Sequence, residues 1–246
     1  MRLKPDNSRC VALMVTCMVD QVMPEIGVAT VKLLRRAGYR VEFPADQTCC
    51  GQPFFNSGFR EQAAALVRRT IEIFEDYPAV VLPGGSCTAM IRKEYPHLLE
   101  AWPDWHERAL QMAAKTFELS EFLVHQAQWQ PKAAAVAPRV TYHDSCHMNR
   151  MLHLKSEPRT LLKAAGCTLV EMNESDRCCG FGGVFSIRMP EVSNAMTAEK
   201  LRRASGAGAD LLVASDPGCL MQMRGMLDGS TVRAEHLAVV LEELTR

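Results

Sequence analysis

Apolar positions along the first half of the chain predict strands that alternate with helices. The continuous apolar run CVALMVT at residues 10–16 is typical of a buried strand. From Pro24 onward apolar residues recur at helical spacing, and Gly38 is expected to end that helix. The same order continues with a strand at residues 39–43, a helix between residues 63 and 74, and a strand at residues 79–83.

The second half predicts the same succession of elements. It reads as a strand at residues 139–146, a helix at 158–166, a strand at 168–172, a helix at 192–203 and a strand at 210–215. Because strands that alternate with helices form parallel sheets with right-handed crossovers, the expected fold class is α/β. We expect two tandem duplicated repeats, each a small parallel-sheet Rossmann-like unit with flanking helices. They span residues 1–125 and 139–246, with an alanine- and proline-rich linker at residues 126–138.

Eight of the ten cysteines follow this duplication. Three positions recur 129 residues later, and a fourth recurs 132 residues later. The first quartet comprises Cys17, Cys49, Cys50 and Cys87, and the second quartet comprises Cys146, Cys178, Cys179 and Cys219. Surrounding text repeats as well, for example TFELSEFL from Thr116 and TVRAEHLA from Thr231. Two copies indicate a duplicated domain rather than a solenoid. The remaining cysteines, Cys10 and Cys167, are expected to be small core residues.

Composition and charge narrow the classes of function. The 246 residues include 28 basic and 28 acidic side chains, so the formal net charge is zero. No basic excess points to nucleic acid, and no apolar run approaches the ~18 residues of a membrane span. The first apolar run ends at Asp20 without a small-residue cleavage site. We therefore expect a buried first strand rather than an export signal, and a cytoplasmic protein.

The positions of the quartets predict two metal sites. Ligands of open parallel sheets bind beyond the carboxyl ends of the strands, and each repeated cysteine lies at or just after a predicted strand end. Four thiolates gathered in this way hold an iron–sulfur cluster or zinc, and redox dithiols are a third interpretation. Iron–sulfur is favoured, because all-cysteine zinc sites generally use cysteines two to four residues apart, and that spacing is absent here.

Glycines follow both pairs of adjacent cysteines. Glycine adopts backbone angles that other residues avoid. Its amide N–H group can also approach cluster sulfurs closely enough to tune a reduction potential. The glycines expected to contact the cofactor in this way are Gly51, Gly180, Gly182 and Gly183.

The double cysteine spacing, with the motifs YHDSCH, CCGFGGVFS and DPGCLMQ, resembles the cysteine-rich CCG domain family. That family includes the cysteine-rich subunit of heterodisulfide reductase and the iron–sulfur subunit of glycolate oxidase, and the similarity is greatest to its lactate-utilization branch. The resemblance covers the chain from about Cys10 to Leu244. It implies an oxidoreductase subunit of a complex that oxidises L-lactate to pyruvate. It also implies that the eight cysteines ligate iron–sulfur clusters. As partners it implies a ferredoxin-like iron–sulfur subunit and a third lactate-utilization subunit.

The loops that carry Cys87 and Cys219 depart from the family pattern. The fuller pattern ends each repeat in Cys-x-x-Cys, but Met90 and Gln222 occupy the final positions here. Four thiols per repeat fit one ordinary 4Fe-4S cluster in each, with zinc as the alternative at one site. Asp216 and the following proline predict a turn that delivers Cys219, although Asp216 can also accept a hydrogen bond from a loop amide.

Polar side chains surround Cys146 in YHDSCHMNR. Oxidation of a 2-hydroxy acid requires a base, and histidine titrates near neutral pH, so His143 and His147 are candidate catalytic residues. Arginine binds carboxylates through a bidentate fork, which makes Arg150 and Arg188 candidates for substrate binding. In the alternative interpretation these residues orient loops and shield the metal site. Two other functions stay open: a heterodisulfide-type thiol–disulfide reductase subunit, and a zinc-binding assembly factor without catalytic activity.

Overall fold

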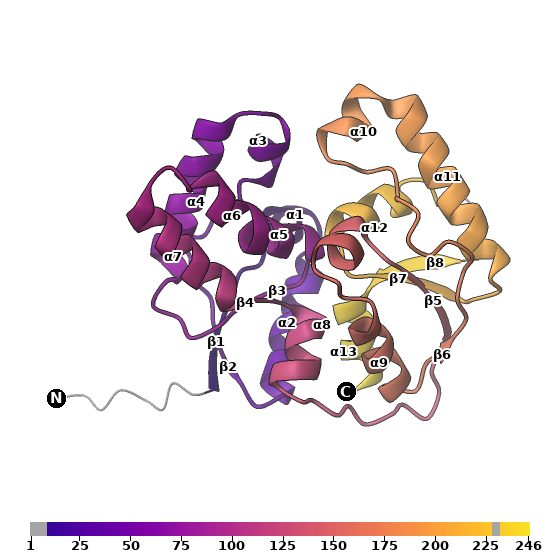
Figure 1. Cartoon of the computed structure of the whole chain (residues 1–246). Helices are drawn as coiled ribbons and strands as arrows, with labels where there is room; N and C mark the ends of the chain where they lie inside the picture. The colour runs from indigo at the N-terminus through magenta and orange to yellow at the C-terminus, as the bar shows by residue number, and fades with distance from the viewer. Residues whose placement is uncertain (1–8, 228–231) are drawn as a thin grey trace.

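The structure, a computed structural model, describes residues 9–227 and 232–246 and contains two four-stranded parallel sheets, one in each half of the chain (Figure 1). Their strand orders correspond, β2-β1-β3-β4 and β6-β5-β7-β8. The predicted α/β class with duplicated parallel sheets is thereby confirmed. The strands are β1 (Cys10–Leu13), β2 (Arg40–Glu42), β3 (Val80–Leu82), β4 (Thr116–Glu118), β5 (Arg139–His143), β6 (Thr168–Leu169), β7 (Leu211–Ala214) and β8 (Arg233–His236).

Helices connect the strands of both sheets. The first half contains α1 (Cys17–Val22), α2 (Pro24–Arg36), α3 (Gln52–Asn56), α4 (Arg60–Phe74), α5 (Gly85–Ala89), α6 (Tyr95–Leu98), α7 (Pro103–Ala114) and α8 (Leu119–Glu121). The second half contains α9 (Ser156–Ala164), α10 (Val184–Arg188), α11 (Pro190–Gly206), α12 (Pro217–Arg224) and α13 (Leu237–Leu244). Short π-helical turns occur at Met90–Glu94, Phe122–Gln126 and His147–Met151. Within the predicted linker, residues 126–138, Gln126 still belongs to the π-helical turn that precedes it, and residues 127–138 contain no helix or strand.

Local sequence explains where the predicted helices start and stop. Pro24 stands in the first turn of α2, where its missing N–H costs no hydrogen bond. The chain leaves that helix through Gly38, whose φ of 89° is a left-handed angle that favours glycine. The sequence predicts a turn at Asp216, but the structure has a helix there, because Pro217 begins α12. Proline is favoured in the first turn of a helix for the same reason as in α2.

The apolar pattern does not predict the fourth strand of either sheet. β4 and β8 are three and four residues long, too short to show a clear alternation. Both lie in the repeated text TFELSEFL and TVRAEHLA, of which Thr231 falls outside the described residues. Each strand leads directly into a helix, α8 or α13. The repeated text therefore encodes a strand followed by a helix at the edge of each sheet.

A shared hydrophobic core joins the two halves. Helix α2 packs against α13, and buried residues such as Leu33 and Leu241 belong to one continuous cluster (Figure 1). At the edge of this contact Arg36 donates a hydrogen bond of 2.8 Å to the carboxylate of Glu242 and one of 3.0 Å to its backbone carbonyl. A second cluster lies between β3, α4 and α7 of the first half. The shared core fixes the two sheets relative to each other.

Candidate metal centres

The first quartet assembles where three strands of the first sheet end. Its members come from the start of α1, from the loop after β2 and from α5 after β3. The Sγ atoms of Cys17 and Cys49 are 3.8 Å apart. Those of Cys50 and Cys87 are 3.3 Å apart, and a hydrogen bond between the thiols of Cys49 and Cys50 completes the row. Four sulfurs from distant parts of the sequence thus meet at one edge.

The second quartet repeats this arrangement on the second sheet. Cys146 precedes the π-helical turn after β5, the adjacent pair lies in the loop before α10, and Cys219 lies in α12. Thiol hydrogen bonds join Cys146 to Cys178 and Cys179 to Cys219, and another joins the adjacent pair. The structure therefore brings together both quartets that the sequence indicated. Their role as metal ligands stays a prediction.

Backbone amides converge on the sulfurs of the second quartet. The N–H of Gly180 donates to the Sγ of Cys178, and the N–H of Phe181 donates to that of Cys179, each at 3.4 Å. Gly180 has a φ of 93°, and its counterpart Gly51 has a φ of 89°. Both angles are left-handed and favour glycine, which turns the chain sharply after each cysteine pair. The amide contacts are of the kind that tune iron–sulfur sites.

All eight repeated cysteines line one cavity of about 220 Å³ between the two halves. Contacts between the halves close this region. Asp216 accepts hydrogen bonds from the backbone N–H and the hydroxyl of Ser86, at 2.9 and 3.1 Å. Gln52 and His147 form a hydrogen bond of 3.1 Å across the same junction. Asp216 thus takes the role that the sequence gave as its alternative, and the two quartets face a common space.

The thiols shift one another's pKa values. Hydrogen bonds from Cys146 and Cys179 lower the pKa of Cys178. The bond to Cys178, together with burial, raises the pKa of Cys146, and in the first quartet the bond to Cys49 and burial likewise raise that of Cys17. Most thiols in each row are therefore neutral unless a cation is bound. A coordinated metal ion reverses this balance, because coordination deprotonates a thiol outright.

The donor sets fit a metal group. Each quartet offers four soft sulfur ligands, which select iron–sulfur clusters or zinc over magnesium or calcium. A tetrahedral zinc ion with Zn–S bonds of ~2.3 Å would hold its sulfurs about 3.8 Å apart, as Cys17 and Cys49 are. An iron–sulfur cluster is larger than one ion, and the cavity beside each quartet provides adjoining space. Gly182 and Gly183 line that cavity next to the second quartet.

His143 is buried against the second quartet. Only 1% of its surface is exposed, and the backbone of Ser175 approaches the ring without closing a hydrogen bond of good geometry. A ring nitrogen lies within 4.8 Å of the sulfurs of Cys179 and Cys219. Burial lowers the pKa of His143 to about 3, so the ring stays neutral at physiological pH. The ring thus offers one N–H donor and one lone pair beside the thiols.

The other predicted catalytic residues occupy different surroundings. His147 is half-buried and lines the cavity. Arg150 is exposed and donates to the backbone carbonyl of Asp176 at 3.4 Å, and Arg188 is exposed at the end of α10. Neither arginine is among the residues that line the cavity. The roles of these side chains stay predictions.

Sequence reasoning did not single out Lys200, although this residue is fully buried beside the second quartet. Its Nζ donates to the backbone carbonyls of Glu174 and Ser175 at 3.2 and 3.0 Å. Burial lowers its pKa to about 8, and the nearby sulfur of Cys179 acts in the opposite direction. In sequence it is one lysine in an amphipathic helix, where exposure is the usual expectation. Only the position of α11 against the loop reveals its burial.

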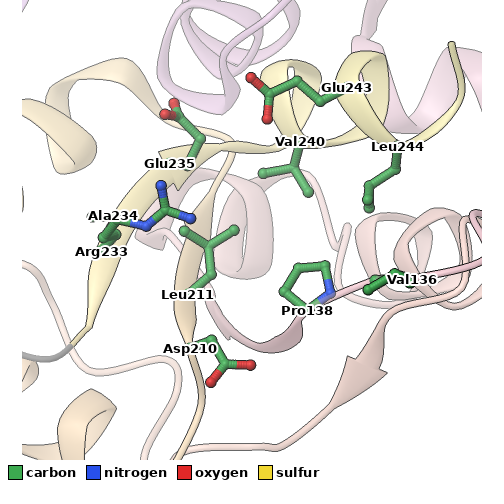
Figure 2. A pocket seen from close by; sticks show the side chains of 11 residues that line it. Val136, Pro138, Asp210, Leu211, Arg233, Ala234, Glu235, Val240, Glu243 and Leu244 are labelled. Atoms are coloured by element: carbon green, nitrogen blue, oxygen red, sulfur yellow. The ribbon is translucent and has the colours of Figure 1, made fainter.

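A second hollow, of about 580 Å³, lies away from the cysteines (Figure 2). It surrounds the first residues of β7 and β8, and its floor includes Leu211 and Val240. Charged side chains at its rim include Asp210, Arg233 and Glu243 (Figure 2). Parallel sheets bind ligands at the opposite, carboxyl ends of their strands. The hollow contains no cysteine, and we assign it no role in the metal centres.

Comparisons with known proteins match both halves of the chain. Residues 11–92 and 140–224 match the family model described as a cysteine-rich domain, CCG. The chain is 44% identical over 234 residues to lactate utilization protein A of Geobacillus kaustophilus, and 43% identical over 234 residues to that of Bacillus subtilis. Each alignment covers 94% of this chain and 98% of the relative.

One solved structure, a hypothetical protein from Helicobacter pylori, has a TM-score of 0.67 with this chain at 10% identity. The similarity covers 99% of this chain and 50% of that protein, and it concerns the fold alone. Among the described residues, none of the helices combines the length and the apolar character that crossing a membrane requires.

Proposed function

Because this chain belongs to the cysteine-rich CCG domain family, we propose that it is an iron–sulfur electron-transfer subunit in the oxidation of L-lactate to pyruvate. The relatives named lactate utilization protein A support a role in lactate utilization. The observation that carries the proposal is the convergence of eight thiols, in two quartets, on one cavity between the halves. Each quartet would hold one 4Fe-4S cluster.

The chemistry of the reaction suits two centres. Conversion of lactate to pyruvate releases two electrons and two protons. Iron–sulfur clusters held by four cysteines supply electron transfer when bound. A chain with two such sites can therefore take both electrons of one substrate molecule. Those electrons would leave to a ferredoxin-like iron–sulfur subunit, and a third lactate-utilization subunit would complete the complex in the cytoplasm.

Protons require a separate acceptor, and His147 is the best placed side chain of those predicted. It lines the cavity, is only half-buried, and its hydrogen bond to Gln52 orients the ring. We propose that His147 takes the proton of the substrate hydroxyl in the cavity and that the second proton passes to water. Arg150 contributes positive charge to the site, since it lowers the pKa of Cys146, against the larger opposite effects of the neighbouring thiols and burial. Substrate binding by Arg188 would have to occur outside the cavity lining.

Anaerobic purification of the full chain, with counting of iron and acid-labile sulfide, tests the centres. We expect about eight iron and eight sulfide per chain, as two four-iron clusters require. Lactate is then added to the chain alone and to the chain reconstituted with the two partner subunits. Loss of visible cluster absorbance only in the complex supports an electron-transfer subunit.

Two other outcomes would replace the proposal. Stoichiometric zinc without sulfide would indicate the assembly factor. The 3.8 Å spacing of Cys17 and Cys49 fits a zinc ion, whereas the 3.3 Å spacing of Cys50 and Cys87 is shorter. A cluster signal that responds to a disulfide but not to lactate would indicate a thiol–disulfide reductase. Lactate oxidation by the chain alone would show that it is the catalyst and not only an electron carrier.

A further inference from the structure

The two quartets differ in the residue that follows the first strand of each sheet. With Cys17 aligned on Cys146, His143 corresponds to Met14. Both side chains are buried, at 1% and 0% exposure. In the second half this position therefore holds an imidazole near the sulfurs, and in the first half it holds an apolar thioether.

The long helix that packs against each cysteine loop, α4 or α11, carries a second difference. A Cβ atom on Gly180 would meet Ser193 and Met196 of α11, and one on Gly51 would meet Ala63 and Leu66 of α4. These contacts match α11 with α4 at one constant spacing in the sequence. At that spacing Lys200 of α11 is the equivalent of Thr70 of α4, and both side chains are buried.

The hydrogen bonds of these two residues differ as well. Thr70 uses its hydroxyl within its own helix, where it donates to the carbonyl of Leu66 at 2.9 Å. Lys200 carries an ammonium group that donates hydrogen bonds to two backbone carbonyls of the loop at Glu174 and Ser175. A buried cation of the second half thus replaces a neutral hydroxyl of the first.

Carboxylates near the second quartet oppose this cation in part. Asp144 is held by Arg159 in a bidentate pair of 2.7 and 2.9 Å, which offsets part of its charge, because Arg159 also binds Glu171 at 2.6 Å. Asp176 also lies near Lys200 and attracts it. Asp216 raises the pKa of Cys219 and opposes the cation there.

The charge of Asp216 does not differ between the two centres, because its carboxylate also accepts hydrogen bonds from Ser86, the residue before Cys87. Its negative charge therefore acts on both quartets.

We propose that Lys200 and His143 are positioning residues that make the centre of the second quartet the more readily reduced of the two. The inference rests on the proposed function, in which both quartets hold iron–sulfur clusters. Reduction adds one negative charge to a buried group. A nearby ammonium and an imidazole N–H stabilise that charge, and the effect is strong where water is excluded.

The consequence is a direction of electron flow within the chain. One electron moves from the reduced first centre to the oxidised second centre, which leaves the first oxidised and the second reduced. The second half, which also carries His147 at the cavity, then collects electrons. The partner iron–sulfur protein would draw them from that side.

Redox titration of single-centre variants, followed by electron paramagnetic resonance, tests this order. Cys50→Ala is expected to leave only the second centre, and Cys179→Ala only the first. We expect a more positive midpoint potential for the second centre. Adding Lys200→Met to Cys50→Ala should lower that potential by about tenfold in the reduction equilibrium, or about 59 mV for a one-electron couple. His143→Met, which installs the first-half residue, should lower it in the same direction, and Lys200→Arg should largely restore it.

Lys115→Met is the matched control. Lys115 also donates to backbone carbonyls, those of Phe74 and Tyr77 at 3.0 and 2.8 Å, but it lies beside the first residue of β4, away from the cysteine edge. Its loss should leave both potentials unchanged.

Equal midpoint potentials in the two single-centre variants would overturn the inference, as would equal shifts of both centres with Lys200→Met. A chain without iron and sulfide would overturn the proposed function as well, so the two failures are distinguishable by metal counting. If Lys200→Met does not fold, the order of the two wild-type potentials and the His143→Met shift decide the matter.

Discussion

The two halves hold their cysteine pairs in the same backbone shape but support that shape with different side chains. In the first half the hydroxyl of Tyr95 donates to the carbonyl of Cys50 at 2.9 Å. In the second half the hydroxyl of Thr197 donates to the carbonyl of Cys179 at 2.8 Å. Tyr95 comes from α6, beyond the third strand, whereas Thr197 comes from the helix next to the pair. A duplicated fold therefore preserves the geometry of the loop while the charges around it are free to diverge.

Loss of one cysteine from each quartet gives the largest expected effect and tests whether the halves are independent. Cys50→Ser and Cys179→Ser should each remove about half of the bound iron and sulfide, because a four-iron cluster needs its four thiolates. Lactate-dependent electron transfer in the reconstituted complex should fall at least about a hundredfold in both variants, since losing a metal-site partner alone can cost about 10–100-fold. Cys167→Ser, a buried cysteine outside the quartets, is the control and should retain all iron. Loss of all iron from either variant would show that the centres assemble together.

The helices after the fourth strands begin at two buried titrating side chains whose pKa values shift in opposite directions. Glu118 and His236 end β4 and β8 and cap α8 and α13. Burial raises the pKa of Glu118 to about 7 and lowers that of His236 to about 4. The stability from Glu118 is present below its unfolded pKa of 4.5 and is lost as pH rises through about 7. That from His236 is present above its unfolded pKa of 6.5 and is lost as pH falls through about 4.

Substitution of these two caps should therefore change the pH dependence in opposite directions. With Glu118 present, the free energy of unfolding should fall by up to about 3 kcal/mol between about pH 5 and about pH 8, and Glu118→Gln should remove this fall. With His236 present, the free energy of unfolding should fall by a similar amount as the pH drops from about 7 to about 4, and His236→Asn should remove this fall. Urea unfolding across this pH range measures both. Parallel pH profiles for the two variants would contradict the assigned shifts.

The glycines after the cysteine pairs should differ in their tolerance of alanine. A Cβ on Gly180 would lie 2.4 Å from the backbone oxygen of Ser193, whereas a Cβ on Gly51 finds its nearest atom at 3.5 Å. Gly51→Ala should cost about 1–2 kcal/mol, from the left-handed backbone angle alone. Gly180→Ala should cost about 2–3 kcal/mol more, because the backbone must also shift. Chemical unfolding of the metal-free chain measures both, and equal costs would contradict this difference.

Loss of the hydroxyls that hold the pairs should cost less than Gly180→Ala. Tyr95→Phe and Thr197→Val each leave a buried cysteine carbonyl without this donor, at a cost of about 1–3 kcal/mol. Thr197→Val should be the more costly, because the same hydroxyl also accepts a hydrogen bond from Gln222 at 3.1 Å. Unfolding free energies of the two variants give the comparison. Gln222→Met, the control, removes the contacts of Gln222 with Thr197 and Ser193 but keeps the bond to the Cys179 carbonyl, and should cost less than Thr197→Val.

Much of the fold followed from the sequence because its elements are marked by long apolar runs and by proline and glycine at their ends. Helices α2, α4, α9 and α11 and the first three strands of each half were predicted close to their observed positions. The fourth strands, β4 and β8, were missed, since three or four residues show too little periodicity. Helix α12 was predicted as a turn, because a proline that begins a helix and one that forms a turn look alike in sequence.

The sequence by itself determined that each half gathers four cysteines at one edge of a parallel sheet. Strand and helix periods fix at which end of a strand each loop leaves, and the cysteine spacing places thiols in those loops. Only the tertiary structure decided that the two quartets face one cavity, that Asp216 joins the halves there, and that Lys200 is buried. These facts depend on how α2 and α13 pack, and the periodicity of a single chain segment carries no information about the relative placement of two sheets.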